Sequence, residues 1–309
     1  MASNYRSAEF PLDSTFAMTD DGITVDQMLQ EPTRITRYVN EVVNQNLLSE
    51  KLFSSTPVSG GILIYNQILG KVNDEETKFR SNVREPGGEF AEIDQTQIRE
   101  QWTKVRQIGG RVAITDEAVK RNDTAFLQKE LRRLANMMVR DIDLDAVKAF
   151  NDAVAALPAE TKDATQVASV GWNQTTKTKS ADVIPANQII ADLEALRLRI
   201  NEIDLGYNYS TLLVSPKRES DLRISMGAQN AQALLSSYGW TIEVSPHVTD
   251  TEAWLLAPKQ VGVLGVETPT TTTPWRDEAH LTTHTQTYTT LGHAITDPMA
   301  LLHLTGIEK

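Results

Sequence analysis

Residues 115–157 constrain the fold more than any other part of the chain, because they contain no proline and no glycine. Thr115 can accept a hydrogen bond as the N-cap, and Asp116 and Glu117 lie in the first turn, where the helix dipole favours carboxylates. An apolar stripe follows at helical spacing, formed by Leu127, Leu131, Leu134, Met138, Ile142, Ala149 and Ala153. An unbroken helix of roughly 40 residues spans about 60 Å, so we expect an elongated molecule. A break near Asn151 is the alternative.

Residues 57–112 have strand-like ends and a polar middle. One strand-like run begins at Ile62 and another at Ile98, and Pro86-Gly87-Gly88 predicts a turn between them. We expect the two ends to pair as a long hairpin. The middle holds too few apolar residues for a core of its own, so we expect the hairpin to lie on a neighbouring subunit.

The remaining segments predict an α+β fold with mixed strands. Apolar residues at helical spacing indicate helices over residues 33–52, with Thr33 as N-cap, over 185–203 and over 217–223. We predict strands over residues 212–214, 240–244, 253–257, 261–266, 281–291 and 300–304. We predict loops over residues 158–181, 227–237 and 268–274, the last a threonine-rich linker or edge loop. Residues 1–21 are typical of an arm that a partner orders.

Composition narrows the class of protein. The 309 residues include 30 basic and 41 acidic side chains, a net charge of −11, which disfavours tight binding of the whole chain to DNA. The absence of cysteine excludes disulfides, thiolate nucleophiles and cysteine-based zinc sites. No apolar run approaches the roughly 20 residues that cross a bilayer, and residues 1–10 lack the apolar stretch of a signal peptide.

Three carboxylates, Asp141, Asp143 and Asp145, match the opening of a calcium loop. The loop also requires glycine at its sixth position and glutamate at its twelfth, where this chain has Ala146 and Asp152. Residues two apart on a helix diverge, so the three carboxylates cannot converge on one ion. We interpret them as a solvated acidic face.

The C-terminal histidines do not form a metal-binding pattern. On one strand His280 and His284 would lie about 13 Å apart, too far for one zinc ion. His293 and His303 are interpreted in the same way, as histidines on strands and turns. Gly87-Gly88-Glu89-Phe90 resembles the signature of cyclic-dinucleotide synthases, but a hairpin turn explains its glycines more simply. We therefore predict no catalytic residue, no cofactor and no metal ligand.

Charge is unevenly distributed along residues 115–157. Basic residues gather first, at Lys120, Arg121, Lys129, Arg132, Arg133 and Arg140, and acidic residues follow at Asp141, Asp143, Asp145 and Asp152. The simpler interpretation is a solvated face with pairs such as Glu117 with Arg121. The functional interpretation is a contact between subunits, in which opposite charges meet.

Three segments carry a resemblance to a known family. They are Arg84-Glu85-Pro86-Gly87-Gly88-Glu89-Phe90 with the strand-like run after it, Thr115-Asp116-Glu117-Ala118 opening the long helix, and Tyr288-Thr289-Thr290-Leu291-Gly292-His293-Ala294 with the segment to Gly306. In this order they resemble the extended loop, the spine helix and the closing segment of tailed-bacteriophage major capsid proteins of the Hong-Kong-ninety-seven type. Encapsulin shells share that fold.

The resemblance implies an N-terminal arm and helix (residues 1–56), an extended loop (57–112), a peripheral domain with the spine helix (113–181), an axial domain (182–266) and C-terminal strands of the peripheral domain (267–309). It implies a structural protein of the virion, assembled in the host cytoplasm, whose copies form pentamers and hexamers around double-stranded DNA. Residues 227–237 are the candidate for the loop at the symmetry axes. Implied partners are a separate scaffolding protein, a portal and head decoration proteins, with no membrane.

Some family members join the extended loop to a neighbour through a Lys–Asn isopeptide bond. Arg84 lies at the loop turn here, and an arginine cannot form that bond, so we expect non-covalent shells. Two alternatives stay open. The first is an encapsulin-type nanocompartment, and the second is a metal-dependent hydrolase that uses His280, His284 and nearby acids.

Overall fold

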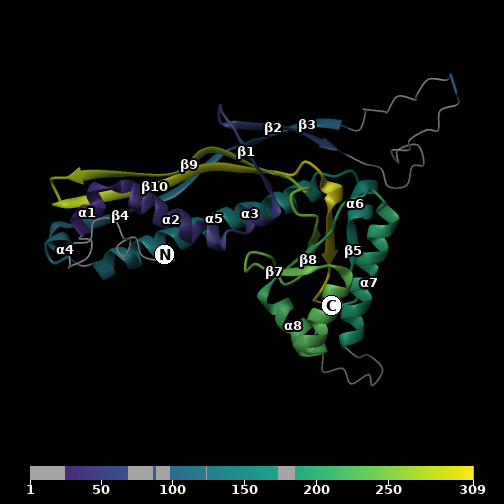
Figure 1. Cartoon of the computed structure of the whole chain (residues 1–309). Coiled ribbons are helices and arrows are strands. Elements are labelled where there is room, and N and C mark those ends of the chain that lie inside the picture. The colour runs from purple at the N-terminus through teal and green to yellow at the C-terminus, as the bar shows by residue number, and fades with distance from the viewer. Residues whose placement is uncertain (1–24, 69–85, 88–97, 123, 173–184, 309) are drawn as a thin grey trace.

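The computed structural model describes residues 25–68, 86–87, 98–122, 124–172 and 185–308. Figure 1 shows an L-shaped molecule, in which a long limb of strands and helices meets a compact unit at one end. The elongation predicted from residues 115–157 is therefore confirmed. The predicted arm over residues 1–21 and the polar middle of the hairpin lie outside the described residues, apart from Pro86 and Gly87, which form a turn as predicted.

The limb contains a four-stranded sheet in the order β1-β9-β10-β4. Two long strands, β9 (Val263–Asp277) and β10 (Thr282–Ala294), pair antiparallel along the limb. The strand β4 (Arg106–Thr115) pairs antiparallel with β10, and the short strand β1 (Ser54–Pro57) pairs parallel with β9. One face of this sheet packs on helices.

Two helices, α2 (Pro32–Asn46) and α5 (Thr124–Ala155), cover that face, with the shorter α1 (Val25–Gln30), α3 (Leu48–Leu52) and α4 (Asp116–Lys120) beside them. The apolar stripe predicted for α5 is buried at Leu127, Leu131, Leu134, Met138 and Ile142. The predicted face of α2 is buried at Ile35, Tyr38, Val39 and Val43. Pro32 occupies the first turn of α2 and Glu31 is its N-cap residue, so Thr33 as N-cap was wrong.

The long helix is broken near its start and not at Asn151, which lies inside α5. Thr115 caps α4 by accepting a hydrogen bond from the Ala118 amide, as predicted. Helix α4 then ends, and Asn122 adopts a left-handed conformation with φ of 51°. Its side-chain oxygen accepts a hydrogen bond from the Val25 amide at 2.9 Å, which ties the break to α1. The 32 residues of α5 still span about 48 Å.

The threonine-rich run predicted as a linker or edge loop lies inside β9, so that prediction was wrong. Strand β1 pairs only with Val263–Val266, so the rest of β9 is a sheet edge, where proline is tolerated. Thr272 and Thr287 pair through their hydroxyls at 3.0 Å, and both are buried. β-Branched threonine suits a pleated strand, so the composition that indicated a linker also fits an edge strand.

The compact unit is built on a five-stranded sheet in the order β5-β11-β8-β6-β7. These strands are β5 (Gln166–Ala168), β6 (Thr211–Val214), β7 (Thr241–Val244), β8 (Glu252–Leu256) and β11 (Leu301–Thr305). Strands β6 and β8 are buried along their whole length. The helices of this unit are α6 (Ala159–Thr165), α7 (Pro185–Ile203), α8 (Pro216–Met226) and α9 (Ala228–Tyr238), and η2 (Pro298–Ala300) precedes β11. Helix α7 has the predicted bounds.

Two loop predictions in this unit were wrong. Residues 227–237 belong mostly to α9, because Gly227, with φ of 79°, ends α8 and a new helix begins after it. Ala231 and Leu235 bury one side of α9, and left-handed Gly239 ends it. Residues 158–181 include α6 and β5, and residues 173–184 lie outside the described residues.

Candidate assembly surface

A two-stranded hairpin stands apart from both larger sheets. Strands β2 (Ile62–Ile68) and β3 (Ile98–Lys104) pair antiparallel, with Ile62 opposite Lys104 and Ile64 opposite Trp102. The predicted pairing of the two ends is therefore confirmed. Figure 1 shows the hairpin above the limb, on the side of the sheet away from α2 and α5.

The two faces of the hairpin differ in burial, because successive side chains in a strand point to opposite sides. Leu63 and Gln67 face the body and are buried, and the Gln67 amide reaches the Ile295 carbonyl at 3.5 Å. On the opposite face Ile62, Ile64 and Trp102 are exposed, the last two by 64% and 60%. We call these three side chains the outer patch. Glu100 and Lys104 flank it and line the same 320 Å³ hollow.

A strand switch joins the hairpin to the limb. The run predicted as one strand over residues 98–112 is two strands in different sheets, β3 and β4, with Val105 between them. The Val105 amide donates to the Gly61 carbonyl at 3.2 Å, which closes the base of the hairpin. Gly292 of β10 passes beside the switch, where a Cβ atom would lie 3.2 Å from the Lys104 carbonyl oxygen. Periodicity alone could not reveal this switch.

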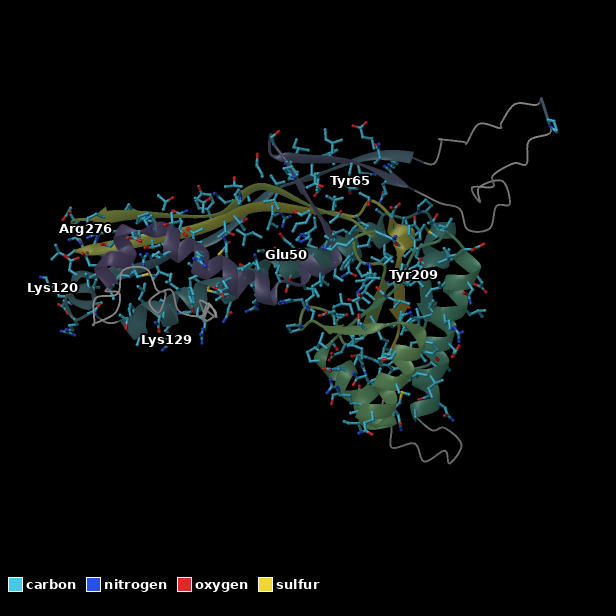
Figure 2. The ribbon with its side chains drawn as sticks, in the orientation of Figure 1. Glu50, Tyr65, Lys120, Lys129, Tyr209 and Arg276 are labelled. Carbon is cyan, nitrogen blue, oxygen red and sulfur yellow. The ribbon has the colours of Figure 1, made fainter. Side chains whose placement is uncertain are left out.

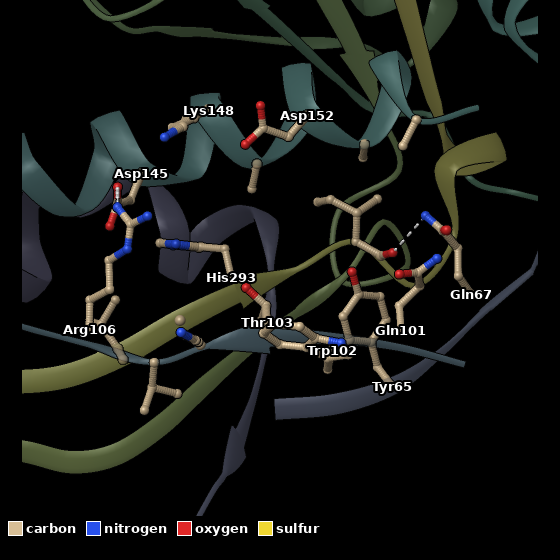
Figure 3. A pocket seen from close by; sticks show the side chains of 18 residues that line it. Tyr65, Gln67, Gln101, Trp102, Thr103, Arg106, Asp145, Lys148, Asp152 and His293 are labelled. Carbon is tan, nitrogen blue, oxygen red and sulfur yellow. Dashed lines mark hydrogen bonds and ion pairs between the residues drawn. The ribbon is translucent and has the colours of Figure 1, made fainter. Parts of the chain in front are cut away.

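A cavity of about 520 Å³ separates the inner face of the hairpin from the last turns of α5. Figure 3 shows Tyr65, Gln101 and Thr103 on one side of it and Lys148 and Asp152 on the other. An ion pair at its edge joins Arg106 of β4 to Asp145 of α5 at 3.2 Å. The hairpin therefore lies over a cavity whose lining combines charged, polar and apolar side chains.

His293 lines this cavity and is buried. Its Nε2 atom lies 2.9 Å from the Ser49 hydroxyl, and its ring packs against Phe53. Burial lowers the pKa of His293 to about 4, so the ring is neutral at pH 7. The residue is a packing element of the joint between α3, β10 and α5.

Asp143 departs from the predicted solvated acidic face. Its side chain is 8% exposed and accepts a hydrogen bond from the Leu48 amide, at the start of α3, at 3.1 Å. Burial raises the pKa of Asp143 to about 6. Asp141 is exposed and Asp145 pairs with Arg106, so the three carboxylates lie in three different environments. The sequence contained no signal for this burial, because it depends on where α3 docks.

Polar contacts fix the compact unit to the limb. The Lys259 ammonium donates to the carbonyl oxygens of Glu50 and Phe53, the latter at 2.9 Å. Lys51 pairs with Glu243 of β7 at 2.7 Å. Figure 2 shows Glu50 where the limb meets the compact unit. Because each contact joins residues about 200 positions apart in sequence, none was predictable from local patterns.

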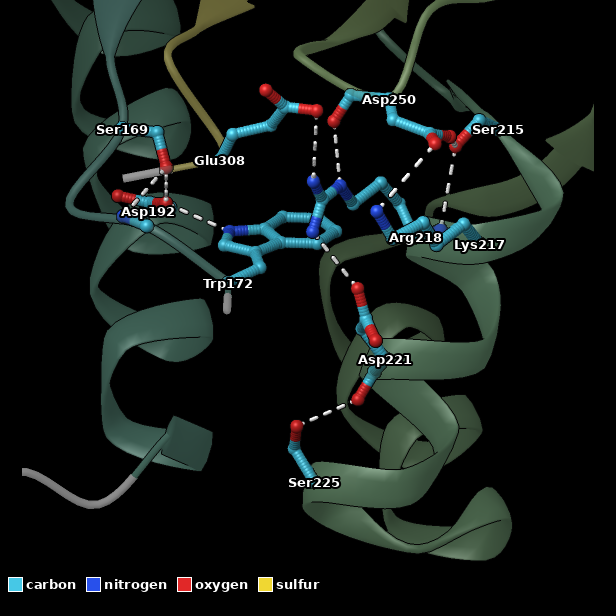
Figure 4. A network of polar contacts seen from close by, with 11 residues as sticks. Ser169, Trp172, Asp192, Ser215, Lys217, Arg218, Asp221, Ser225, Asp250 and Glu308 are labelled. Atoms are coloured by element: carbon cyan, nitrogen blue, oxygen red, sulfur yellow. Dashed lines mark hydrogen bonds and ion pairs between the residues drawn. The ribbon is translucent and has the colours of Figure 1, made fainter. Parts of the chain in front are cut away.

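Arg218 of the compact unit is a buried cation, with 2% of its side chain exposed. Its Nε atom donates to the Asp250 carbonyl at 2.6 Å, and its Nη1 atom pairs with Asp221 at 2.9 Å. Glu308 approaches its Nη2 atom at 4.0 Å, so the network reaches the C-terminal segment (Figure 4). Nearby, Asp192 accepts a hydrogen bond from the Trp172 indole at 2.7 Å.

The two histidines of the hydrolase hypothesis, His280 and His284, both approach the carboxylate of Asp277. His280 lies in the turn between β9 and β10, where Leu281 has φ of 49°, and His284 lies in β10, in agreement with the interpretation of these residues as histidines on strands and turns. His280 approaches Asp277 at 2.8 Å and His284 approaches it at 3.8 Å. His303 stacks on Trp254 inside the compact unit. Within the described ranges no three His, Cys, Asp or Glu side chains form a group that could hold a metal ion.

An exposed apolar hairpin face on an elongated chain is typical of the class of proteins that bind neighbouring copies or partners. The particular family follows from comparison with known proteins. Residues 98–304 match the family model described as phage capsid protein, so the chain belongs to that family. It is a structural capsid protein of a bacteriophage, as the resemblance of the three sequence segments implied.

Solved structures support the same fold at low sequence identity. The virus-like particle from Pyrococcus furiosus is 13% identical, with a TM-score of 0.61, and the match covers 89% of this chain and 99% of that one. The capsid of cyanophage P-SCSP1u is 12% identical, with a TM-score of 0.57 and coverage of 85% and 89%. The mature capsid of bacteriophage PhiM1 is 13% identical, with a TM-score of 0.54 and coverage of 84% and 87%.

A comparison with curated proteins gives no match. Among the described helices, none combines the length and the apolar character that crossing a membrane requires.

Proposed function

We propose that this capsid protein is the major subunit of an icosahedral phage head, in which pentamers and hexamers of the chain enclose double-stranded DNA. The observation that carries the proposal is the outer patch. Isolated two-stranded hairpins are at best marginally stable, and this one presents Ile62, Ile64 and Trp102 to solvent. A neighbouring copy that covers these side chains would remove the exposed apolar surface and hold the hairpin in place.

The parts of the chain have separate roles in this proposal. Within the N-terminal arm and helix (1–56), the arm reaches neighbouring subunits while α2 packs on its own chain, and the extended loop (57–112) also reaches a neighbour. Residues 113–181 and 267–309 form the peripheral domain, and residues 182–266 form the axial domain. The sheet of the compact unit also draws on β5 and β11, so the axial domain is anchored by strands from both sides of residues 182–266. Because residues 227–237 are mostly helical, α9 takes the place of an axis loop in this proposal.

Assembly in this proposal uses no covalent links, takes place in the host cytoplasm and involves a separate scaffolding protein, a portal and head decoration proteins. Denaturing electrophoresis of mature particles is expected to give one band of single-chain mass. A ladder of linked multimers would refute the non-covalent shell.

Electron microscopy of the purified full-length chain, alone and with the adjacent gene products of its phage, tests the proposal. Closed shells or ring-shaped capsomers are the expected products. A chain that stays monomeric under all these conditions contradicts the proposal. Particles that enclose an enzyme cargo in place of DNA would favour the encapsulin alternative.

A further inference from the structure

Helix α5 carries a row of cations on its exposed side. We define the basic stripe as Lys129, Arg132, Arg133 and Arg140, all of them exposed. Together with Ala125, Gln128, Asn136 and Met137 they line a groove of about 670 Å³. Among the described residues, no carboxylate lines this groove, although Glu130 pairs with Arg133 at 3.9 Å. The stripe is therefore a local reversal of charge on a chain with a net charge of −11.

The helix geometry places the stripe away from the core and from the hairpin. Arg133 and Arg140 each follow a buried residue, Leu131 and Met138, by two positions, which is about 200° around the helix. Asp152, which lines the cavity under the hairpin, is about 140° around the helix from Lys129. In Figure 2, Lys129 lies on the side of α5 away from β9 and β10. The stripe and the outer patch thus face opposite sides of the limb.

In a shell one subunit thick, two opposite faces of a subunit become the inner and the outer surface. The apolar outer patch suits a protein neighbour, whereas four of the eight side chains that line the groove of the stripe are cationic. Lys129 and Arg140 lie 11 residues apart, so the stripe extends about 16 Å along the helix. Several phosphates of one DNA strand fit within that length.

We propose that the basic stripe binds the phosphate backbone of the enclosed DNA, without reading its sequence. This inference rests on the proposed function, because it requires the chain to surround DNA. Arginine guanidinium groups pair with phosphate oxygens through two parallel hydrogen bonds, and lysine adds a point charge. The stripe places both types in one groove. Its neighbours Gln128 and Asn136 add neutral hydrogen-bond donors to the same groove.

The proposal is tested on the soluble full-length chain before assembly, with a fluorescein-labelled 24-base-pair duplex titrated at several KCl concentrations. The stripe variant is Lys129→Gln with Arg133→Gln and Arg140→Gln. The matched control is Arg197→Gln with Lys217→Gln and Arg223→Gln, three exposed cations of α7 and α8. Both variants lose three positive charges, so an effect of net charge alone would appear in both.

The stripe variant is expected to lose affinity, and the slope of log K against log[KCl] is expected to fall by up to about 2.7, since each phosphate contact contributes about 0.9. The control variant, and a variant that carries Arg133→Lys and Arg140→Lys, should keep the wild-type slope to within about 0.9, the contribution of one phosphate contact. Equal losses of DNA affinity and of slope in the stripe and control variants would overturn the proposal.

Other occupants of the stripe give different results. Displacement of the duplex by poly-glutamate at equal charge concentration would assign the stripe to an acidic protein. A tenfold gain in DNA affinity on changing Asp13, Asp20 and Asp21 to asparagine would assign it to the chain's own N-terminal residues. Microscopy of the same preparations separates the two proposals: shells formed by a chain with no stripe-dependent DNA binding refute this inference alone, and a chain that forms no shells refutes the proposed function.

Discussion

The outer patch gives the sharpest prediction, because a neighbour that covers it must bury Trp102. The side chain is 60% exposed in the single subunit. A tryptophan buries about 150–250 Å² when fully enclosed, so about 90–150 Å² remains for an interface. At about 25 cal/mol per Å² this area contributes about 2–4 kcal/mol to each contact. Trp102→Ala should therefore weaken subunit association about 30-fold or more.

The same substitution should leave the isolated subunit almost unchanged, within about 0.5 kcal/mol, because an exposed side chain contributes little to folding. Urea unfolding of the dissociated chain measures the first quantity, and light scattering against subunit concentration measures the threshold for assembly. Leu198→Ala, which removes an equally exposed apolar side chain from α7, is the control. Unchanged assembly by Trp102→Ala, with wild-type stability, would refute the role of the patch.

Three further predictions concern the stability of the subunit. Burial raises the pKa of Asp143 to about 6, so its contribution to stability is present below about pH 4 and is lost as the pH rises through 6. Wild type should therefore lose up to about 3 kcal/mol of unfolding free energy between pH 4 and pH 7.5 that the Asp143→Asn variant does not lose. Parallel curves of stability against pH for the two proteins would contradict this. Burial lowers the pKa of His293 to about 4, so its contribution to stability is present above about pH 6.5 and is lost as the pH falls through 4. His293→Asn should make the stability less dependent on pH in this range, which acid unfolding followed by tryptophan fluorescence measures. An unchanged pH midpoint of acid unfolding would argue against this. Arg218→Met should cost about 3–5 kcal/mol in urea unfolding, because it leaves Asp221 and the Asp250 carbonyl without their partner; a cost below about 1 kcal/mol would show that the network is dispensable.

A fourth prediction tests the packing of β4 on β10. A Cβ atom at Gly109 would lie 2.3 Å from the Thr287 carbonyl oxygen, so Gly109→Ala should destabilise the subunit by about 1–3 kcal/mol or more. Gly206→Ala is the control, because no atom lies within 4 Å of its added Cβ. The only cost of that substitution is the backbone strain of an alanine at a positive φ. Thermal unfolding compares the two variants, and an equal loss in both would show that β4 yields to the added methyl group.

Helices with strong apolar spacing were predictable from the sequence. Pro185–Ile203 has the predicted bounds, and the buried stripe of α5 agrees with the pattern because local spacing decides which helix face meets a core. Residues 227–237 show the limit of this reasoning. Their small and polar side chains indicated a loop, yet two buried positions and glycines at both ends suffice for a helix that packs on α8.

Other features depend on contacts between distant segments, and local patterns do not contain them. Asn122 breaks the long helix because α1 supplies a donor to its side chain from 97 positions away. The threonine run is part of β9 because it pairs with β10. The chain changes sheets at Val105 because β4 also pairs with β10, whereas β3 pairs with β2. The outer patch could be predicted only in part. The sequence showed that the hairpin has no core of its own, but which apolar side chains remain exposed depends on the register of β2 and β3.

Cryo-electron microscopy of particles assembled from the full-length chain tests the central claim most directly. The predicted result is a closed shell in which every hairpin lies on a neighbouring copy and the Trp102 indole is buried between subunits. A shell in which Trp102 faces solvent in all subunits would contradict the claim that the neighbour completes the fold of the hairpin.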